Sequence, residues 1–159
     1  MSITWAEDAI PVAAVVHSHV RGEIYRAVTG LGALLYGECL IPSTTAELPV
    51  TLVGSSQPPF VTSQPNAAEQ TGHSLPAVVP TSARSATWAR PPCRSADVAA
   101  GRMDGFRLYD RDAGNLLGAS LIAREPGGLV SDADGNPWHP RATSFLAAPA
   151  QLHAPAWTG

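Results

Sequence analysis

Acidic and amide side chains gather in one short stretch of this sequence. Asp104, Asp110, Asp112 and Asn115 lie close together in it. Oxygen ligands of this kind are what Mg²⁺ prefers, so Asp110 and Asp112, with Asp104 close in sequence, could form a metal site. A simpler interpretation is that Asp112 or Asn115 caps a helix, accepting hydrogen bonds from free backbone N–H groups at its beginning.

Two further groups of polar side chains have metal-like spacing. Asp132 and Asp134 begin a DADGN segment, but Gly135 comes too early for an EF-hand loop, which favours a turn. His17 and His19 share one face of an expected strand and could form half of a zinc site. The sequence offers them no evident third ligand, so a surface or packing role is favoured. No nucleophile-elbow or Cys–His signature is present.

The elements expected around these residues run from Val98 to Gly135. The sequence predicts the end of a helix over residues 98–101, a strand over 104–109 and a helix over about 116–125. Two glycines end that helix, and a strand over 129–131 and a turn over 132–137 follow. Residues 144–148 form a final buried strand. Together these elements indicate an α/β chain of layered sheets and helices.

The preceding part of the chain is richer in strands. Alternating or continuous apolar residues predict strands over 11–17, 23–28, 49–53 and 75–81. Three glycines within residues 30–40 predict a tightly turning connection around a short strand. Residues 54–74 are polar and predict an irregular loop or a poorly ordered helix. The 159 residues are expected to form a single domain.

Composition excludes several classes of function. All ten basic residues are arginines, which removes lysine-dependent chemistry such as a P-loop or a Schiff base. The net charge of −3 and the lack of a basic cluster argue against a nucleic-acid partner. No apolar run reaches the length of a membrane span, and the N-terminus lacks the charge order of a signal peptide, so we expect a cytoplasmic protein with Cys39 and Cys93 reduced.

Two clusters of motifs give the chain a resemblance to a known family. The first is GEIYRAVTGLGALLYGECL at residues 22–40, and the second is VAAGRMDG at 98–105 followed by REPGG and LVSDADG at 124–135. Their content and order resemble the C-terminal part of the inositol monophosphatase family. The resemblance implies a layered α/β/α/β/α sandwich and a magnesium-dependent phosphatase of inositol and related sugar phosphates.

The positions that carry chemistry in the family differ here. The family's first acidic motif and its D-P-[IL]-D-G-[ST] motif have no counterpart in this sequence. The resemblance places Asn115 at a metal-binding aspartate and Leu108 at a substrate-contacting glutamate. It places residues 89–92, ARPP, at a turn that contacts phosphate through backbone N–H groups, which proline lacks.

These differences define what we expect of the chain. It is an inositol-monophosphatase-like protein that is inactive alone, its missing ligands lying in a longer protein or a partner chain. The alternatives are a non-catalytic binding or interaction module and a poorly folding remnant. Magnesium is expected of the family, and a phosphorylated small molecule is its class of ligand. Apolar strands left uncovered also predict a homo-oligomer or a partner chain.

Overall fold

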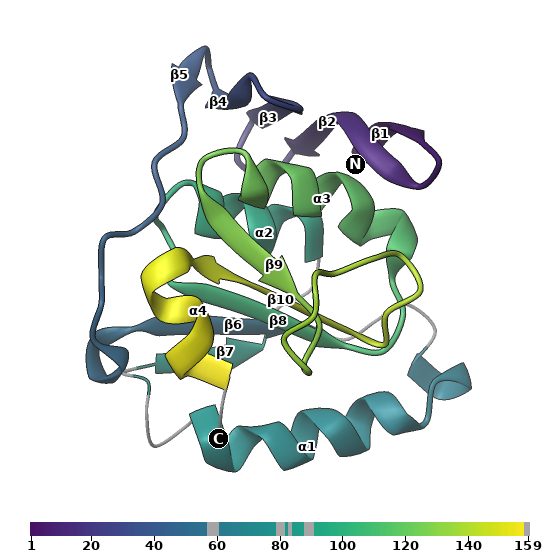
Figure 1. Cartoon of the computed structure of the whole chain (residues 1–159), viewed down its shortest axis with the longest axis vertical. Helices are drawn as coiled ribbons and strands as arrows, with labels where there is room; N and C mark the ends of the chain where they lie inside the picture. Colours follow the sequence, from purple (N-terminus) through teal and green to yellow (C-terminus); the bar gives the residue numbers. More distant parts are fainter. Residues whose placement is uncertain (57–60, 79–81, 83, 88–90, 158–159) are drawn as a thin grey trace.

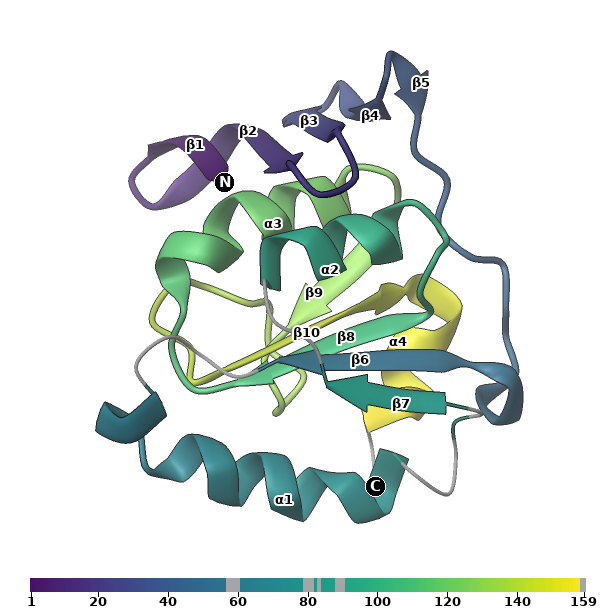
Figure 2. The ribbon, with the colours of Figure 1, turned by 180° about the vertical axis from the view of Figure 1, so that it is seen from behind.

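The computed structural model of the chain describes residues 1–56, 61–78, 82, 84–87 and 91–157. Two five-stranded sheets form alternate layers with helices (Figure 1). Helices α2 (Pro91–Ala99) and α3 (Ala113–Arg124) lie between the sheets. Helix α1 (Asn66–Val78) lies beneath the second sheet, where α4 (Ala150–Trp157) also packs (Figure 2). The predicted α/β layered fold is therefore confirmed.

The first sheet, called the N-terminal sheet below, is an antiparallel meander. Its strands follow chain order: β1 (Ser2–Glu7), β2 (Ile10–Ser18), β3 (Glu23–Val28), β4 (Gly32–Leu35) and β5 (Glu38–Cys39). Side chains alternate between its two faces, so that Ala14, Val16 and Tyr25 are buried against the helices. Each neighbouring pair is joined by a short turn, so the pairing of these strands is local in the sequence.

The second sheet, called the C-terminal sheet, is mixed. Its order is β7 (Arg84–Thr87), β6 (Leu52–Ser56), β8 (Gly105–Tyr109), β10 (Ser144–Pro149) and β9 (Gly128–Ser131). Strand β6 pairs in parallel with both β7 and β8, whereas β10 pairs antiparallel with β8 and β9. The carboxyl ends of β6 and β8 therefore meet at one edge, where ligands commonly bind in α/β sheets.

Helices α2 and α3 form a shared layer because both of their faces are apolar. One face packs on the N-terminal sheet through Ile122 and Ala96, and the other packs on Phe106 and Phe145 of the C-terminal sheet. Gly118 permits the closest approach of α3 to the N-terminal sheet. A Cβ atom at Gly118 would lie 3.2 Å from the Cβ of Ala14 and would overlap the Thr4 hydroxyl.

A network of charges ties the N-terminal sheet to α2. The Asp97 carboxylate is buried, with its Oδ1 2.7 Å from Arg21 Nη1 and its Oδ2 2.8 Å from Arg94 Nη1. Glu23 lies 2.7 Å from Arg21 Nε and 2.8 Å from Arg102 Nη1. Burial and the hydrogen bond that Tyr25 donates to Glu23 raise the pKa of the tyrosine hydroxyl. The ion pairs of Arg21, Arg94 and Arg102 therefore hold α2 against the N-terminal sheet.

Several predicted elements differ from those observed. The expected irregular segment over residues 54–74 contains the end of β6, the 3₁₀ turn Val61–Ser63 and most of α1. The strand predicted over 75–81 is wrong where it is described, because α1 continues to Val78; residues 79–81 lie outside the described residues. The strand predicted over 49–53 begins later, at Leu52, after the 3₁₀ turn Leu48–Val50.

Strands β1 and β7 and helix α4 were not predicted. Strand β1 lies at the N-terminus and pairs with β2, and β7 pairs in parallel with β6. Helix α4 includes Pro155, a residue that counts against a helix in sequence. The predicted segments at β2, β3, β8, α3, β9 and β10 are observed, although α3 begins three residues before the expected Leu116, at Ala113.

Candidate functional site

The candidate site lies where β8 ends and α3 begins. The chain leaves β8 at Tyr109 and turns at Asp110, whose φ of 73° is in the left-handed region that Asp tolerates better than most residues. Asp112 then occupies the N-cap position of α3, and its carbonyl oxygen accepts the N–H groups of Asn115 and Leu116. This short connection brings Asp110, Asp112 and Asn115 to one edge of the C-terminal sheet.

Asp112 and Asn115 bind each other. The Nδ2 atom of Asn115 donates to both carboxylate oxygens of Asp112, at 2.8 and 3.0 Å. Asp112 therefore occupies the predicted N-cap position, but its side chain makes no capping hydrogen bond to the helix backbone. Asp112 is 6% exposed, and burial raises the pKa of its carboxyl, an effect that the hydrogen bond from Asn115 opposes.

The loop after β6 reaches the same place. Gln64 Oε1 and Asp110 Oδ1 each accept the backbone N–H of Arg111, both at 2.9 Å. The N–H of Asp110 donates to the carbonyl of Thr143, 2.6 Å away, just before β10 begins. Arg111 is exposed and is the cation of this connection. The site therefore combines two carboxylates, two amides and one guanidinium.

The other candidate residues lie elsewhere or have structural roles. Asp104 accepts the N–H of Leu52 at 2.8 Å and so fixes the beginning of β6. Asp132 accepts the N–H groups of Asp134 and Asn136 in the predicted turn. Leu108 is 1% exposed and packs in the core, where it cannot touch a ligand. His17 lies in β2 of the other sheet, with His19 just beyond the strand's end.

The phosphate-binding turn expected at residues 89–92 can be judged only in part. Residues 89 and 90 lie outside the described residues, while Pro91 and Pro92 are the first two residues of α2. Proline is compatible with this position because the first N–H groups of a helix have no partner within it. The same two residues offer no N–H group to a phosphate.

A magnesium ion does not fit the residues present. Among the described residues, no three His, Cys, Asp or Glu side chains come together in a group that could hold a metal ion. The sequence of the remaining positions contains none of these four residue types, so they cannot complete such a group. The Asp112 carboxylate is also occupied by Asn115 Nδ2, which is a donor and not a metal ligand.

A cavity of 350 Å³ lies beside the candidate site, between α1 and the C-terminal sheet. Its walls are polar and include Gln70, His73, Tyr109, Asp134 and Ser144. Behind its wall, the buried Arg107 donates to the carbonyl of Ser74, and burial lowers the pKa of its guanidinium. Sequence patterns did not indicate this cavity, because its walls come from four separate segments.

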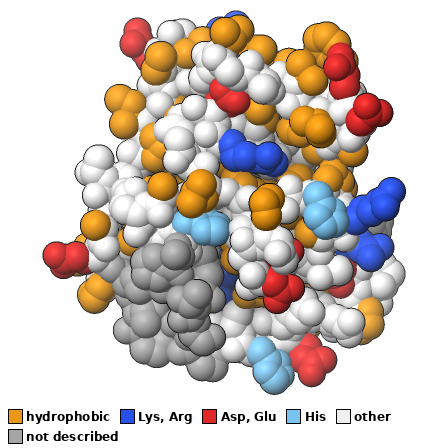
Figure 3. Space-filling view, in the orientation of Figure 1, with side chains coloured by type: hydrophobic (Ala, Val, Ile, Leu, Met, Phe, Trp, Pro, Cys, Tyr) orange, Lys and Arg blue, Asp and Glu red, His pale blue; other side chains and the backbone are white. Residues whose placement is uncertain are grey.

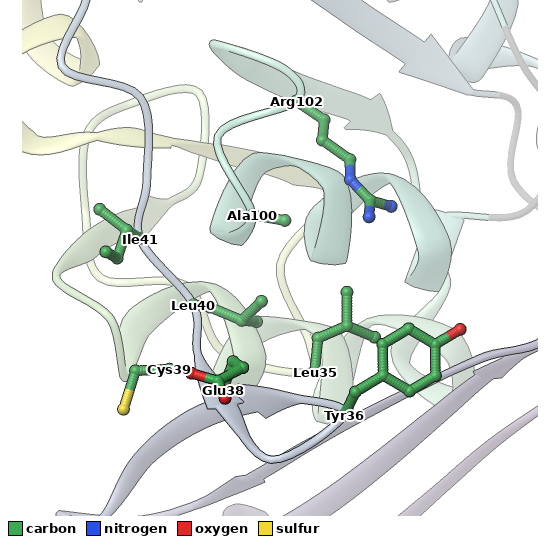
Figure 4. Close-up of a pocket in the computed structure, with 8 residues that line it drawn as sticks. All are labelled: Leu35, Tyr36, Glu38, Cys39, Leu40, Ile41, Ala100 and Arg102. Carbon is green, nitrogen blue, oxygen red and sulfur yellow. The ribbon is translucent and has the colours of Figure 1, made fainter.

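A second cavity, of 410 Å³, lies at the far edge of the N-terminal sheet. Figure 4 shows Arg102 reaching from the end of α2 toward Leu35 and Tyr36, with Cys39 on the outer side. Arg102 is already paired with Glu23, so its charge is largely compensated. Neither cavity is lined by Asp110, Asp112 or Asn115, the residues expected to hold a metal.

None of the described helices is long and apolar enough to cross a membrane.

Comparisons with known proteins bear on this arrangement. The model of the inositol monophosphatase family matches residues 1–158. The inositol-1-monophosphatase of Synechocystis is 32% identical over 158 residues, which cover 91% of this chain and 49% of that protein. A Nus factor SuhB of Haemophilus influenzae is 28% identical, covering 87% of this chain and 51% of that protein. The chain thus spans about half the length of the curated relatives it matches.

Solved structures agree on the fold. The IMPase of Thermotoga maritima superposes with a TM-score of 0.83 at 24% identity, covering 98% of this chain and 57% of that chain. The suhB protein of Bartonella henselae superposes with a TM-score of 0.87 at 22% identity, covering 99% of this chain and 62% of that one. With the family model matching almost every residue, the resemblance seen in the sequence is confirmed, and this chain belongs to the inositol monophosphatase family.

Proposed function

We propose that this chain is an inositol-monophosphatase-like protein that does not hydrolyse phosphomonoesters by itself. The observation that carries the proposal is the contact of Asn115 Nδ2 with both oxygens of Asp112. An amide donor therefore occupies the carboxylate that a metal ion would need. Magnesium remains the cofactor that the family implies, and its binding by these residues alone is not expected.

The chain is expected to be inactive because a catalytic Mg²⁺ ion needs several negatively charged oxygen ligands. A metal in this class of reaction activates water and stabilises the charge that develops on the phosphate, contributions of several kcal/mol to the transition state. Mg²⁺ demands an octahedron of oxygen ligands and loses its water reluctantly. Asp110 and Asp112 lie on one connection, the second of them buried and hydrogen-bonded, and offer too little charge to replace that hydration.

The test is phosphate release by the purified chain from inositol monophosphate, with and without Mg²⁺. The Synechocystis relative serves as the positive control under the same conditions. We expect release by this chain to equal that of a blank. Turnover that a chelator abolishes and added Mg²⁺ restores would overturn the proposal.

A second candidate function is a non-catalytic binding role. Three of the relatives carry the name Nus factor SuhB, or putative Nus factor SuhB, and not the name of a phosphatase. We propose a phosphorylated small molecule as the ligand class, with the exposed Arg111 beside the α3 N-terminus as its contact. Titration calorimetry with inositol monophosphate in the absence of metal would detect this binding. Saturable binding that Arg111→Ala abolishes would favour the second candidate over a chain with no ligand.

A third possibility is that the chain takes part in catalysis only together with a further segment or a partner chain. The relatives are about twice as long as the matched region, so the missing acidic ligands can lie in further chain or in a partner. Activity that appears only when such a segment is added would support this version. We also propose that the protein has no nucleic-acid partner, because its net charge is −3 and it has no basic cluster, and that it is cytoplasmic with Cys39 and Cys93 reduced.

A further inference from the structure

The C-terminal sheet buries an arginine whose charge is not paired. Arg107 lies in the middle of β8, and its side chain points to the face covered by α1, opposite to Phe106 and Leu108. Arg107 is 1% exposed. None of the ion pairs in the described part of the chain includes it, and the other positions hold no Asp or Glu. Burial lowers the pKa of the guanidinium, and the nearby Tyr109 opposes this effect only in part.

The unpaired donors of Arg107 form one edge of its guanidinium. Nη1 donates to the carbonyl of Ser74, 3.1 Å away, and Cζ lies 5.9 Å from the centre of the Tyr109 ring. Nε and Nη2 are buried and have no hydrogen-bond partner within the chain as the structure describes it. These two atoms lie on the same edge of the planar group, and arginine uses this edge to bind two oxygens of a carboxylate or phosphate. Arg107 is therefore oriented for a bidentate oxyanion.

The polar cavity between α1 and the C-terminal sheet lies beside this arginine. Ser74 and Tyr109, which contact the guanidinium, both line the cavity, and its volume of 350 Å³ suits a small molecule. Gln70 and Ser144 add neutral polar groups, and the exposed Asp134 is the one carboxylate among the lining residues. In Figure 3, the described part of the surface over α1 carries acidic and histidine side chains and no large hydrophobic patch. These walls suit a polar molecule with a single anionic group.

We propose that Arg107 binds the carboxylate or phosphate group of a small polar molecule that occupies this cavity. The anion accepts hydrogen bonds from Nε and Nη2, and its charge compensates the buried guanidinium. The Tyr109 side chain, partly exposed at the end of β8, turns aside to admit the anion. The inference is independent of the proposed function, because it needs neither Arg111 nor the contact of Asp112 with Asn115.

Thermal unfolding of the whole chain with added sodium glycerate or inorganic phosphate tests the proposal, with sodium chloride at equal ionic strength as the reference. Saturable stabilisation is expected, by about 5–10 °C at an anion concentration one hundred times Kd. The anion with the lower Kd shows whether the site takes a carboxylate or a phosphate group. An unfolding temperature that neither anion raises beyond the effect of chloride would overturn the proposal.

Two substitutions at Arg107 locate the effect. Arg107→Met places an apolar side chain of similar length in the buried position, so the fold is expected to persist and the response to the anions to disappear. Arg107→Lys keeps the charge but lacks the two-donor edge, and it should raise Kd by about tenfold or more even if Arg107→Met does not fold. Arg124→Met is the matched control and should respond as the wild type does. Arg124 is also largely buried with a lowered pKa, but it lies in α3 and donates to Ser120 Oγ.

The same measurement on Arg111→Ala separates this site from the contact proposed for a phosphorylated ligand at the beginning of α3. Stabilisation by the anions should persist in Arg111→Ala. A response that is lost in Arg111→Ala and kept in the Arg107 variants would overturn the assignment to Arg107. An unchanged Kd in Arg107→Lys would also overturn it, because a lysine cannot reproduce the bidentate contact.

Discussion

At the scale of single residues, the candidate site is decided by one amide. Asn115 gives Asp112 two hydrogen bonds and so lets a buried carboxylate persist at the beginning of α3 without a metal ion. The reversed assignment of the amide atoms would place an oxygen against the carboxylate, so the observed one is favoured. The same geometry makes the effect of restoring an acid at this position predictable.

Replacing Asn115 by Asp should destabilise the protein at neutral pH. Two carboxylates at hydrogen-bonding distance cannot both ionise freely, so the cost should be about 1 kcal/mol or more. The pair would take up a proton on folding, because its folded-state pKa is raised. The variant should therefore approach the stability of the wild type at low pH and lose stability relative to it as the pH rises through that raised pKa. Urea unfolding at several pH values measures this dependence.

Asn115→Ser, which removes the amide without adding charge, is the matched control and should show only a weaker pH dependence of the same sign, because it removes the hydrogen bonds that oppose the raised pKa of Asp112. Millimolar Mg²⁺ should not restore the stability of Asn115→Asp, because one new carboxylate does not complete a site. Tight, stoichiometric Mg²⁺ binding by Asn115→Asp would contradict this and would mean that Asp110 and Asp112 already form the rest of a metal site.

At the scale of elements, the distance of α3 from the N-terminal sheet depends on Gly118, which has no side chain. Gly118→Ala should destabilise the protein by about 1–3 kcal/mol, because the new methyl group meets Thr4 and Ala14 of the N-terminal sheet. Gly114→Ala, in the first turn of the same helix, meets nothing within 4 Å and should stabilise by about 0.5 kcal/mol through helix propensity. Thermal unfolding of both variants measures the difference, and equal effects would show that α3 does not approach the sheet this closely.

The attachment of α2 to the N-terminal sheet depends on Asp97. Asp97→Ala should cost about 3 kcal/mol, because it leaves the Arg21 and Arg94 side chains without their buried partner. Glu69→Ala is the control, since Glu69 meets His73 only across 3.8 Å on an exposed helix face, and its cost should stay below about 0.5 kcal/mol. Chemical denaturation at neutral pH compares the two variants. A similar small loss for both would mean that the Asp97 network contributes no more than a surface pair.

At the scale of the whole molecule, stability and association should be linked. The N-terminal sheet exposes the apolar side chains of Ile3, Trp5 and Ile24. If the folded chain associates through them, its unfolding temperature must rise with protein concentration, because the assembly forms only from folded chains. Scanning calorimetry at widely separated concentrations tests this, and the Trp5→Asp variant, which replaces the largest of these apolar side chains by a charge, should show a weaker dependence on concentration. A wild-type unfolding temperature independent of concentration would contradict the link.

The sequence by itself determined the elements whose patterns are local. The continuous apolar run of β2, the alternation in β3 and the strand–helix–glycine order from β8 to β9 predict those elements, because such patterns depend only on neighbouring residues. Residue identity, set against the family's motifs, also showed which groups were lacking, since Asn115 and Leu108 cannot ionise and the two prolines have no backbone N–H. The family resemblance rests on the same local motifs.

Only the tertiary structure decided the remaining features. Strand β1 exists through pairing with β2, and α1 is a helix although its sequence is polar and contains Pro76, because contacts with β8 and α4 outweigh weak local preferences. The burial of Leu108 and the exposure of Trp5 likewise depend on which distant segments meet. Residue spacing limits such contacts but cannot specify them, because packing selects among many arrangements of the same elements.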